Sequence, residues 1–121
     1  MVAVRRKKDM GTRSLTVFKN GDGEEIAVLY RQMDGYPAVH GAELSAFLEG
    51  KRLVNGMGSN DGPSFNGPEC MAASVIAHFK TDRGAFYLYP AGTRDCGEEY
   101  IYTVEPEEGI EGTIKVTVAE A

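Results

Sequence analysis

The sequence predicts an α+β domain in which a mostly antiparallel five-stranded sheet carries two helices packed on one face. Three observations support this prediction: five segments of β-rich or alternating character, two segments with apolar residues at helical spacing, and their order, β-β-α-α-β-β-β. Connections inside each group of strands are short, which favours neighbouring antiparallel strands. Strands and helices that are segregated along the chain are typical of α+β architectures.

The first two strands form a predicted hairpin. Residues 14–18 (Ser-Leu-Thr-Val-Phe) alternate and are followed at 19–23 by Lys-Asn-Gly-Asp-Gly, a turn cluster because Asn and Gly accept positive φ. Residues 26–32 then provide a second β-rich segment. The following Asp-Gly-Tyr-Pro at 34–37 ends this strand, because proline fixes its own φ and restricts the residue before it.

The two helices lie in the middle of the chain. Residues from about 38 to 49 have helical spacing and end near Gly50. A second helix begins at Pro68, which suits a first helical position, and ends near Arg83. Residues 54–68, between them, have no periodicity and are dense in Gly, Asn, Ser and Pro, which predicts a long loop.

The last three strands follow the second helix, and two of them bring four tyrosines. Residues 86–89, 100–103 and 113–118 each alternate in the manner of a strand. If adjacent strands place the tyrosines on one face, these side chains form a phenolic patch suited to recognition. They equally suit cross-strand pairs that only stabilise the sheet. The four are Tyr87, Tyr89, Tyr100 and Tyr102.

The chain is expected to form one domain over residues 11–121, preceded at 1–10 by a mobile, basic extension. No apolar run approaches the roughly 20 residues of a membrane span, and no apolar segment follows the basic start, so we expect a cytoplasmic protein. Cys70 and Cys96 are too few for a disulfide framework, and no metal-ligand spacing is present. We therefore expect neither a metal nor a cofactor.

Charge is distributed unevenly along the chain. The net charge is −5, although residues 1–9 alone carry +3, and residues 95–121 carry −7 because eight carboxylates oppose Lys115. A body of this sign repels phosphate backbones, so we expect no direct binding of nucleic acid through the domain. The same acidity suits contact with a basic protein surface, or serves solubility alone.

A candidate ligand site lies at one end of the predicted hairpin. Its members are expected to converge beside the start of the first helix, where two guanidinium groups would suit a carboxylate or phosphate. Alternatively, Arg31 pairs with Asp34 or another nearby carboxylate. His40 has a reference pKa near neutrality, as acid–base chemistry requires, and Cys70 could partner it or simply pack. The site residues are Arg13, Arg31, Asp34, Tyr36 and His40.

Four short motifs stand out along the chain: Met-Gly-Thr-Arg-Ser at 10–14, Tyr-Arg-Gln-Met-Asp-Gly-Tyr-Pro at 30–37, Phe-Tyr-Leu-Tyr-Pro at 86–90 and Glu-Tyr-Ile-Tyr at 99–102. With these motifs the chain resembles a family of small, functionally uncharacterised phage and prokaryotic proteins. The resemblance spans most of residues 10–104 and implies a viral or mobile-element setting, with residue 10 as the usual start.

These observations predict a non-catalytic, phage-type accessory protein that contacts a host or viral protein, such as an acidic inhibitor of a host defence protein. The alternative is a protein that binds a small anionic ligand or nucleotide, or a small hydrolase, with its site around Arg31. Candidate partner-binding residues are Tyr87, Tyr89, Glu98, Glu99, Tyr100, Tyr102, Glu107 and Glu108.

Overall fold

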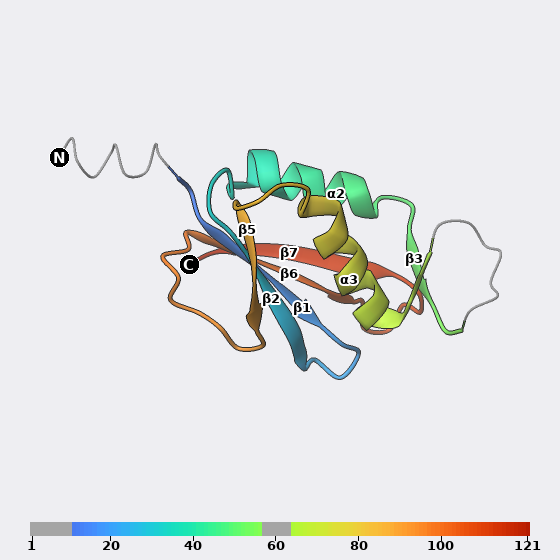
Figure 1. The fold of residues 1–121 in the computed structure, drawn as a ribbon. Coiled ribbons are helices and arrows are strands. Elements are labelled where there is room, and N and C mark those ends of the chain that lie inside the picture. The colour runs from blue at the N-terminus through green and yellow to red at the C-terminus, as the bar shows by residue number, and fades with distance from the viewer. Residues whose placement is uncertain (1–10, 57–63) are drawn as a thin grey trace.

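A computed structural model describes residues 11–56 and 64–121, so the extension predicted at 1–10 and part of the predicted loop lie outside the described residues. Five strands form one sheet in the order β5-β2-β1-β6-β7 (Figure 1). Their bounds are β1 Ser14–Lys19, β2 Glu25–Arg31, β5 Phe86–Pro90, β6 Tyr100–Pro106 and β7 Ile114–Glu120. The predicted α+β class and five-stranded, mostly antiparallel sheet are confirmed.

The sheet is mixed because its two central strands run parallel. β1 pairs antiparallel with β2, which pairs antiparallel with β5, and β6 pairs antiparallel with β7. The junction between these two antiparallel groups is the parallel pairing of β1 with β6. The sheet twists so strongly that β5 and β7, its two edges, cross in Figure 1.

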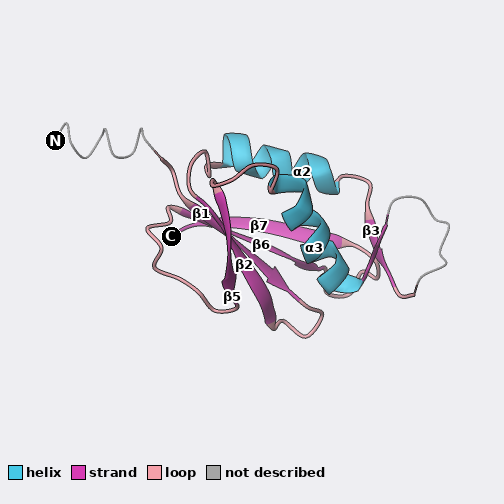
Figure 2. Ribbon diagram, in the orientation of Figure 1, coloured by secondary structure: helices cyan, strands magenta, loops and turns pink. Residues whose placement is uncertain are grey.

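Both predicted helices are present, with different ends. The first begins as a π-helical turn at Pro37–Gly41 and continues as α2, Ala42–Leu48. The second, α3, spans Gly67–Phe79 and so ends four residues before the expected Arg83. Figure 2 shows both helices on the same side of the sheet. Periodicity located the helices but not their ends, which depend on local hydrogen bonding.

The predicted loop at 54–68 contains more structure than expected. Arg52–Val54 forms β3 and Ser64–Asn66 forms β4, and the two pair in parallel as a separate small sheet. Phe65 is buried and Leu53 packs against the main core, which explains why these three-residue strands form without a periodic signal. A strand this short offers too few residues for alternation to be recognised.

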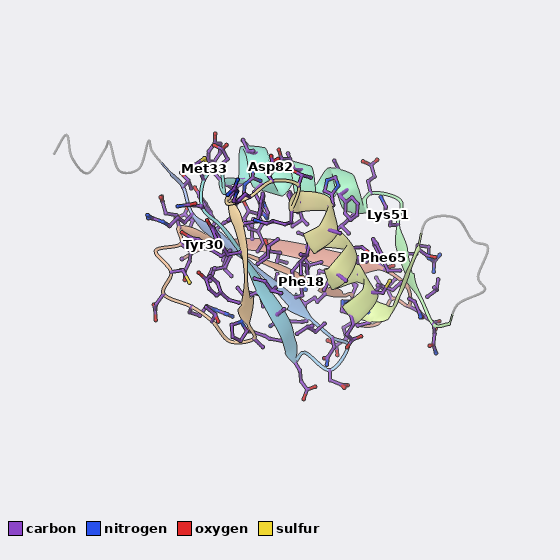
Figure 3. All side chains as sticks on the ribbon, in the orientation of Figure 1. Phe18, Tyr30, Met33, Lys51, Phe65 and Asp82 are labelled. Atoms are coloured by element: carbon purple, nitrogen blue, oxygen red, sulfur yellow. The ribbon has the colours of Figure 1, made fainter. Side chains whose placement is uncertain are left out.

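The main core lies between the sheet and the two helices. Phe18, labelled in Figure 3, is fully buried there beside Leu29 of β2 and Val75 of α3. The remaining buried members of this cluster are Leu44, Leu48, Phe65, Met71, Ala72, Phe79, Tyr102 and Val104. This packing holds the start of α2 against the middle of the sheet.

A second, smaller cluster occupies the opposite face of the sheet, which carries no helix. Leu15, Val17 and Val28 are each at most 1% exposed there. The connection from β5 to β6, residues 91–99, contributes Cys96 to this cluster. An ion pair of 2.6 Å between Arg94 Nη2 and Glu25 Oε2 fastens the same connection to β2. An irregular segment therefore does on this face what helices do on the other.

Candidate functional site

Of the predicted site residues, His40 and Arg31 do lie together, in the interior. The His40 side chain is fully buried between the Phe79 ring, stacked at 4.9 Å, and the Tyr102 ring, edge-on at 4.7 Å between centroids. Its Nε2 lies 2.8 Å from Oγ1 of Thr16 and its Nδ1 lies 3.1 Å from Nη1 of Arg31. Both ring nitrogens are thus engaged by protein groups.

The contact with Arg31 fixes the protonation of His40. A guanidinium can only donate, so Nδ1 of His40 must accept, and its Nε2–H donates to the Thr16 hydroxyl. Burial, reinforced by the positive charge of Arg31, lowers the pKa of His40 to about 3. A buried, neutral imidazole is unsuited to the acid–base role for which its reference pKa made it a candidate.

Arg31 is committed to the protein itself. Its Nη1 donates to Oε1 of Glu43 at 2.7 Å, and its Nε donates to the carbonyl of Met33 at 2.8 Å. The guanidinium also lies over the Phe86 ring at 4.9 Å. The alternative in which Arg31 pairs with a nearby carboxylate is therefore the observed one, with Glu43 of α2 as the carboxylate and not Asp34.

The expected convergence of Arg13 with Arg31 is wrong. Arg31 pairs with Ser14 across the first two strands, so these two side chains share the helix-covered face. Arg13, one residue earlier, packs instead beside Gly97 in the connection on the other face. Two guanidinium groups on opposite faces of a sheet cannot hold one anion. Of the other candidates, Asp34 and Tyr36 are exposed on the turn after β2.

The four tyrosines do not form one patch. Tyr87 and Tyr89 stand on β5, where each ring lies about 6 Å from the Tyr30 ring, on the face without helices. Tyr102 lies on the other face and its hydroxyl donates to the carbonyl of Gly35 at 2.7 Å. Tyr100 packs on that same face against the main core. β2 and β1 separate the two pairs.

The candidate glutamates are divided as well. Glu98 and Glu99 precede β6, and Glu98 accepts hydrogen bonds from the backbone N–H groups of Asp95 and Cys96. Glu107 and Glu108 follow the same strand, whose seven residues span about 20 Å. The carboxylates expected on one flank therefore lie at opposite ends of the sheet.

The two cysteines differ in environment, and neither is paired with His40. Cys70 is exposed at the start of α3, whereas His40 stacks on Phe79 at its end, about 13 Å along the helix. Cys96 is partly buried, and its pKa is raised by burial and by the neighbouring carboxylates of Glu98 and Asp95.

We expect an alkylating reagent to modify Cys70 at least about tenfold faster than Cys96 at pH 7.5, because reaction requires an accessible thiolate. Peptide mapping after timed iodoacetamide treatment measures both rates in one sample. A Cys96 rate equal to that of Cys70 would contradict the packing of residues 91–99 against the sheet.

Among the described residues, backbone N–H and C=O groups without hydrogen-bond partners line the outer edge of β7. The backbone N–H of Ala121 donates to Glu99 and that of Glu107 donates to Thr113, which sets the hydrogen-bonding register between β6 and β7. In this register the alternate residues of β7 direct their N–H and C=O groups away from β6. Within the described residues no hydrogen bond reaches these groups, which belong to Ile114, Val116, Val118 and Glu120.

The other edge of the sheet is shielded. The register with β2 directs the backbone groups of Phe86, Leu88 and Pro90 outward from β5. The Phe86 N–H donates to the carbonyl of Gly84, and its C=O accepts from Nζ of Lys80. Pro90 has no N–H, and its C=O accepts from Thr93. Leu88 alone keeps both backbone groups free among the described residues of this edge.

Two adjoining hollows of about 370 Å³ each run beside the open edge, between β7 and α2. The first is lined by Val116, Val118 and Tyr102, together with residues of the π-helical turn and α2. The second is lined by Ile114 and Leu48 and, at its far end, by charged residues. Figure 1 shows β7 passing beneath α2. The charged residues at the far end of the second hollow are Glu49, Lys51 and Arg52.

Sequence reasoning missed this site, although it identified β7 as a strand. The alternation of residues 113–118 indicates one wet face, but the edge position of the strand depends on the strand order of the whole sheet. Val118 is 46% exposed, and a β-branched apolar residue exposed at an edge is the structural sign of a pairing surface.

Comparison with known proteins returned no match to any family model, to any curated protein or to any solved structure. Among the described residues, no helix has the length and apolar character that crossing a membrane requires. Over the same residues, no three histidine, cysteine or carboxylate side chains are grouped so as to hold a metal ion.

Proposed function

We propose that this chain is a non-catalytic binding protein that acts by pairing the open edge of β7 with an extended segment of a protein chain. The observation that carries the proposal is the coincidence of four outward-facing residues on β7 with two hollows along the same edge. In strand addition, main-chain hydrogen bonds supply affinity and pockets for alternate side chains supply specificity. This site offers both.

The charge and side-chain chemistry of the site define the segment that fits. Side chains opposite Val116 and Val118 enter the hollows beside α2, so they should be apolar and two residues apart. The hollow beside Ile114 ends at Lys51 and Arg52 with Glu49, so an acidic side chain suits that end. For a segment antiparallel to β7, the order is apolar, any residue, apolar, any residue, acidic.

The wider role proposed for this protein is that of a phage-type accessory protein in the cytoplasm of a host cell. Its partner would be a host or viral protein, and occupying a segment which that protein needs would make this chain an inhibitor. The acid-surface version of this role has less support, because the glutamates lie at opposite ends of β6. The anionic-ligand alternative loses its basis with the separation of Arg13 from Arg31.

A selection from displayed random heptapeptides tests the proposed site. We expect the selected peptides to carry two apolar residues spaced by two positions, followed by an acidic residue. A V118P variant should bind these peptides at least about tenfold more weakly than the wild type does. Proline removes one outward N–H and leaves the hydrogen bonds to β6 intact, because those are made by the alternate residues. Circular dichroism and thermal melting establish that the variant is folded.

The matched control is V118T, which keeps the backbone N–H and the branched shape of the side chain. It should bind the selected peptides within about threefold of the wild type, a difference below 1 kcal/mol. Hydrogen exchange should show new protection of the amides of Ile114, Val116 and Val118 on peptide binding. Peptides that bind V118P as tightly as V118T, or that protect another edge, would refute the site.

A further inference from the structure

β7 carries, along its own length, the pattern that its groove accepts. Val116, Val118 and Glu120 are spaced by two residues in the order apolar, apolar, acidic. We infer that the segment added to β7 is β7 of a second copy of this chain, antiparallel to the first about a two-fold axis. This inference rests on the proposed strand-addition function and names its occupant.

One register uses all the free backbone groups of the edge. When Val116 of one copy lies opposite Val118 of the second copy, Ile114 lies opposite Glu120, and every outward-facing residue meets another. The four facing pairs exchange about eight main-chain hydrogen bonds, two in each pair. Shifting the register by two residues leaves at least one of these residues on each strand without a partner.

The same register places suitable side chains beside the hollows. Residues that face each other in this way have their side chains on one face, here the helix-covered face. Val118 and Val116 of the second copy therefore lie along the hollows bounded by α2. Val118, 46% exposed in a single copy, becomes covered by an apolar neighbour.

Charge is complementary at both ends of the paired strands. Glu120 of the second copy comes to lie opposite Ile114, whose hollow also includes Lys51 and Arg52. Lys51 already donates to the carbonyl of Phe47 at the end of α2, where Figure 3 labels it, whereas Arg52 is exposed. Glu49 lines the same hollow, which leaves one net positive charge to meet the incoming carboxylate.

On the face without helices, the two-fold axis passes between the Thr117 residues of the two copies. Thr117 then faces Thr117 of the second copy, and Lys115 faces Ala119. Facing threonines are favourable cross-strand neighbours. The threonines form a pair without hydrogen bonds between them, in which Cα atoms are about 4.5 Å apart, a distance that a disulfide can span.

This geometry gives a register-specific test in the full-length chain. With Cys70 and Cys96 replaced by serine, T117C should form a disulfide-linked dimer in a glutathione redox buffer at least about tenfold faster than A119C or K115C. Each control cysteine faces a different residue type in the second copy and has no thiol opposite it. Equal rates for the three variants would refute the two-fold register.

Charge exchange tests the ends of the interface by sedimentation equilibrium without any covalent link. E120K should weaken dimerisation about tenfold, because it sets three cations around one hollow, and R52E combined with E120K should restore it to within about threefold. The V118P variant should weaken dimerisation at least about tenfold. Failure of the combined variant to recover would overturn the assigned charge contact.

The outcomes separate this inference from the proposed function. A chain that remains monomeric at millimolar concentration, while V118P still abolishes binding of selected peptides, refutes the second copy as occupant and leaves strand addition intact. A dimer that V118P does not weaken refutes the use of this edge by a second copy. If the wild type neither binds selected peptides nor dimerises, both proposals are refuted.

Discussion

An H40Q variant is expected to be less stable than the wild type by about 3 kcal/mol at pH 7.5, and this difference is expected to vanish near about pH 4 and to reverse at lower pH. Glutamine cannot reproduce the ring stacking of His40 on Phe79 and Tyr102 and leaves part of the buried site empty. The closing of the difference follows from the titration of the wild-type side chain.

Burial and Arg31 lower the pKa of His40 from 6.5 to about 3 in the folded chain. Between pH 6.5 and about 3, His40 binds a proton in the unfolded chain but not in the folded chain. The free energy of unfolding therefore decreases as the pH is lowered through this range. Above pH 6.5 both states are neutral at this position and its contribution is complete. Across the window the loss is about 4 kcal/mol in the wild type.

Urea unfolding of the wild type and of H40Q at half-unit steps between pH 3.5 and 8 measures the difference in their free energies of unfolding directly. The pKa of Glu25 is lowered by its hydrogen bonds with Arg94, so protonation of such carboxylates in acid also reduces the free energy of unfolding. This reduction is the same in the wild type and in H40Q. H78Q is the matched control, because His78 is exposed. An H40Q curve parallel to the wild type would show that the pKa of His40 is the same in the folded chain as in the unfolded chain.

A G35A variant is expected to lose about 3 kcal/mol of stability, because there is no room for a methyl group. A Cβ at this position would lie 2.6 Å from Cβ and Oγ of Ser14 and 2.8 Å from the carbonyl of Thr12. The Gly35 N–H donates to the same Thr12 carbonyl, and its C=O accepts from Tyr102, so the backbone cannot retreat without breaking these bonds.

G41A is the matched control for this substitution. Gly41 has helical φ and ψ of −61° and −43°, and a Cβ there would lie 3.4 Å from its nearest neighbour, Cε2 of Tyr102. We expect its free energy of unfolding to stay within about 1 kcal/mol of the wild type. Equal melting temperatures for G35A and G41A would contradict the close approach of Gly35 to β1.

The sequence contained enough information for the elements but not for their lateral order. Alternation identifies a strand such as Ile114–Glu120 because side chains on the two faces meet different surroundings. Which strand lies beside which depends on contacts between distant segments. The parallel pairing of β1 with β6 is such a contact, and no local pattern encodes it.

The predicted site shows the same division. Arg31 and His40 do meet beside the first helix, as the hairpin and the following turn implied. Arg13 does not, because its face was decided by which residue of β1 opposes Arg31. Pairing with Ser14 sends Arg13 to the opposite face, and a one-residue shift in register would have reversed this outcome. Turn chemistry alone did not specify the register.

The difference between the two edges of the sheet, β5 and β7, limits how far copies of this chain can associate. On β5, Lys80, Thr93 and Pro90 leave only Leu88 with free backbone groups, so of the two edges of the five-stranded sheet in the described residues β7 is the one that offers a continuous row of them. Once two molecules have joined there, the described part of the five-stranded sheet has no second open edge for a further copy. Growth into filaments, the usual hazard of exposed strands, ends at the first step, and concentrated solutions of the protein should remain clear.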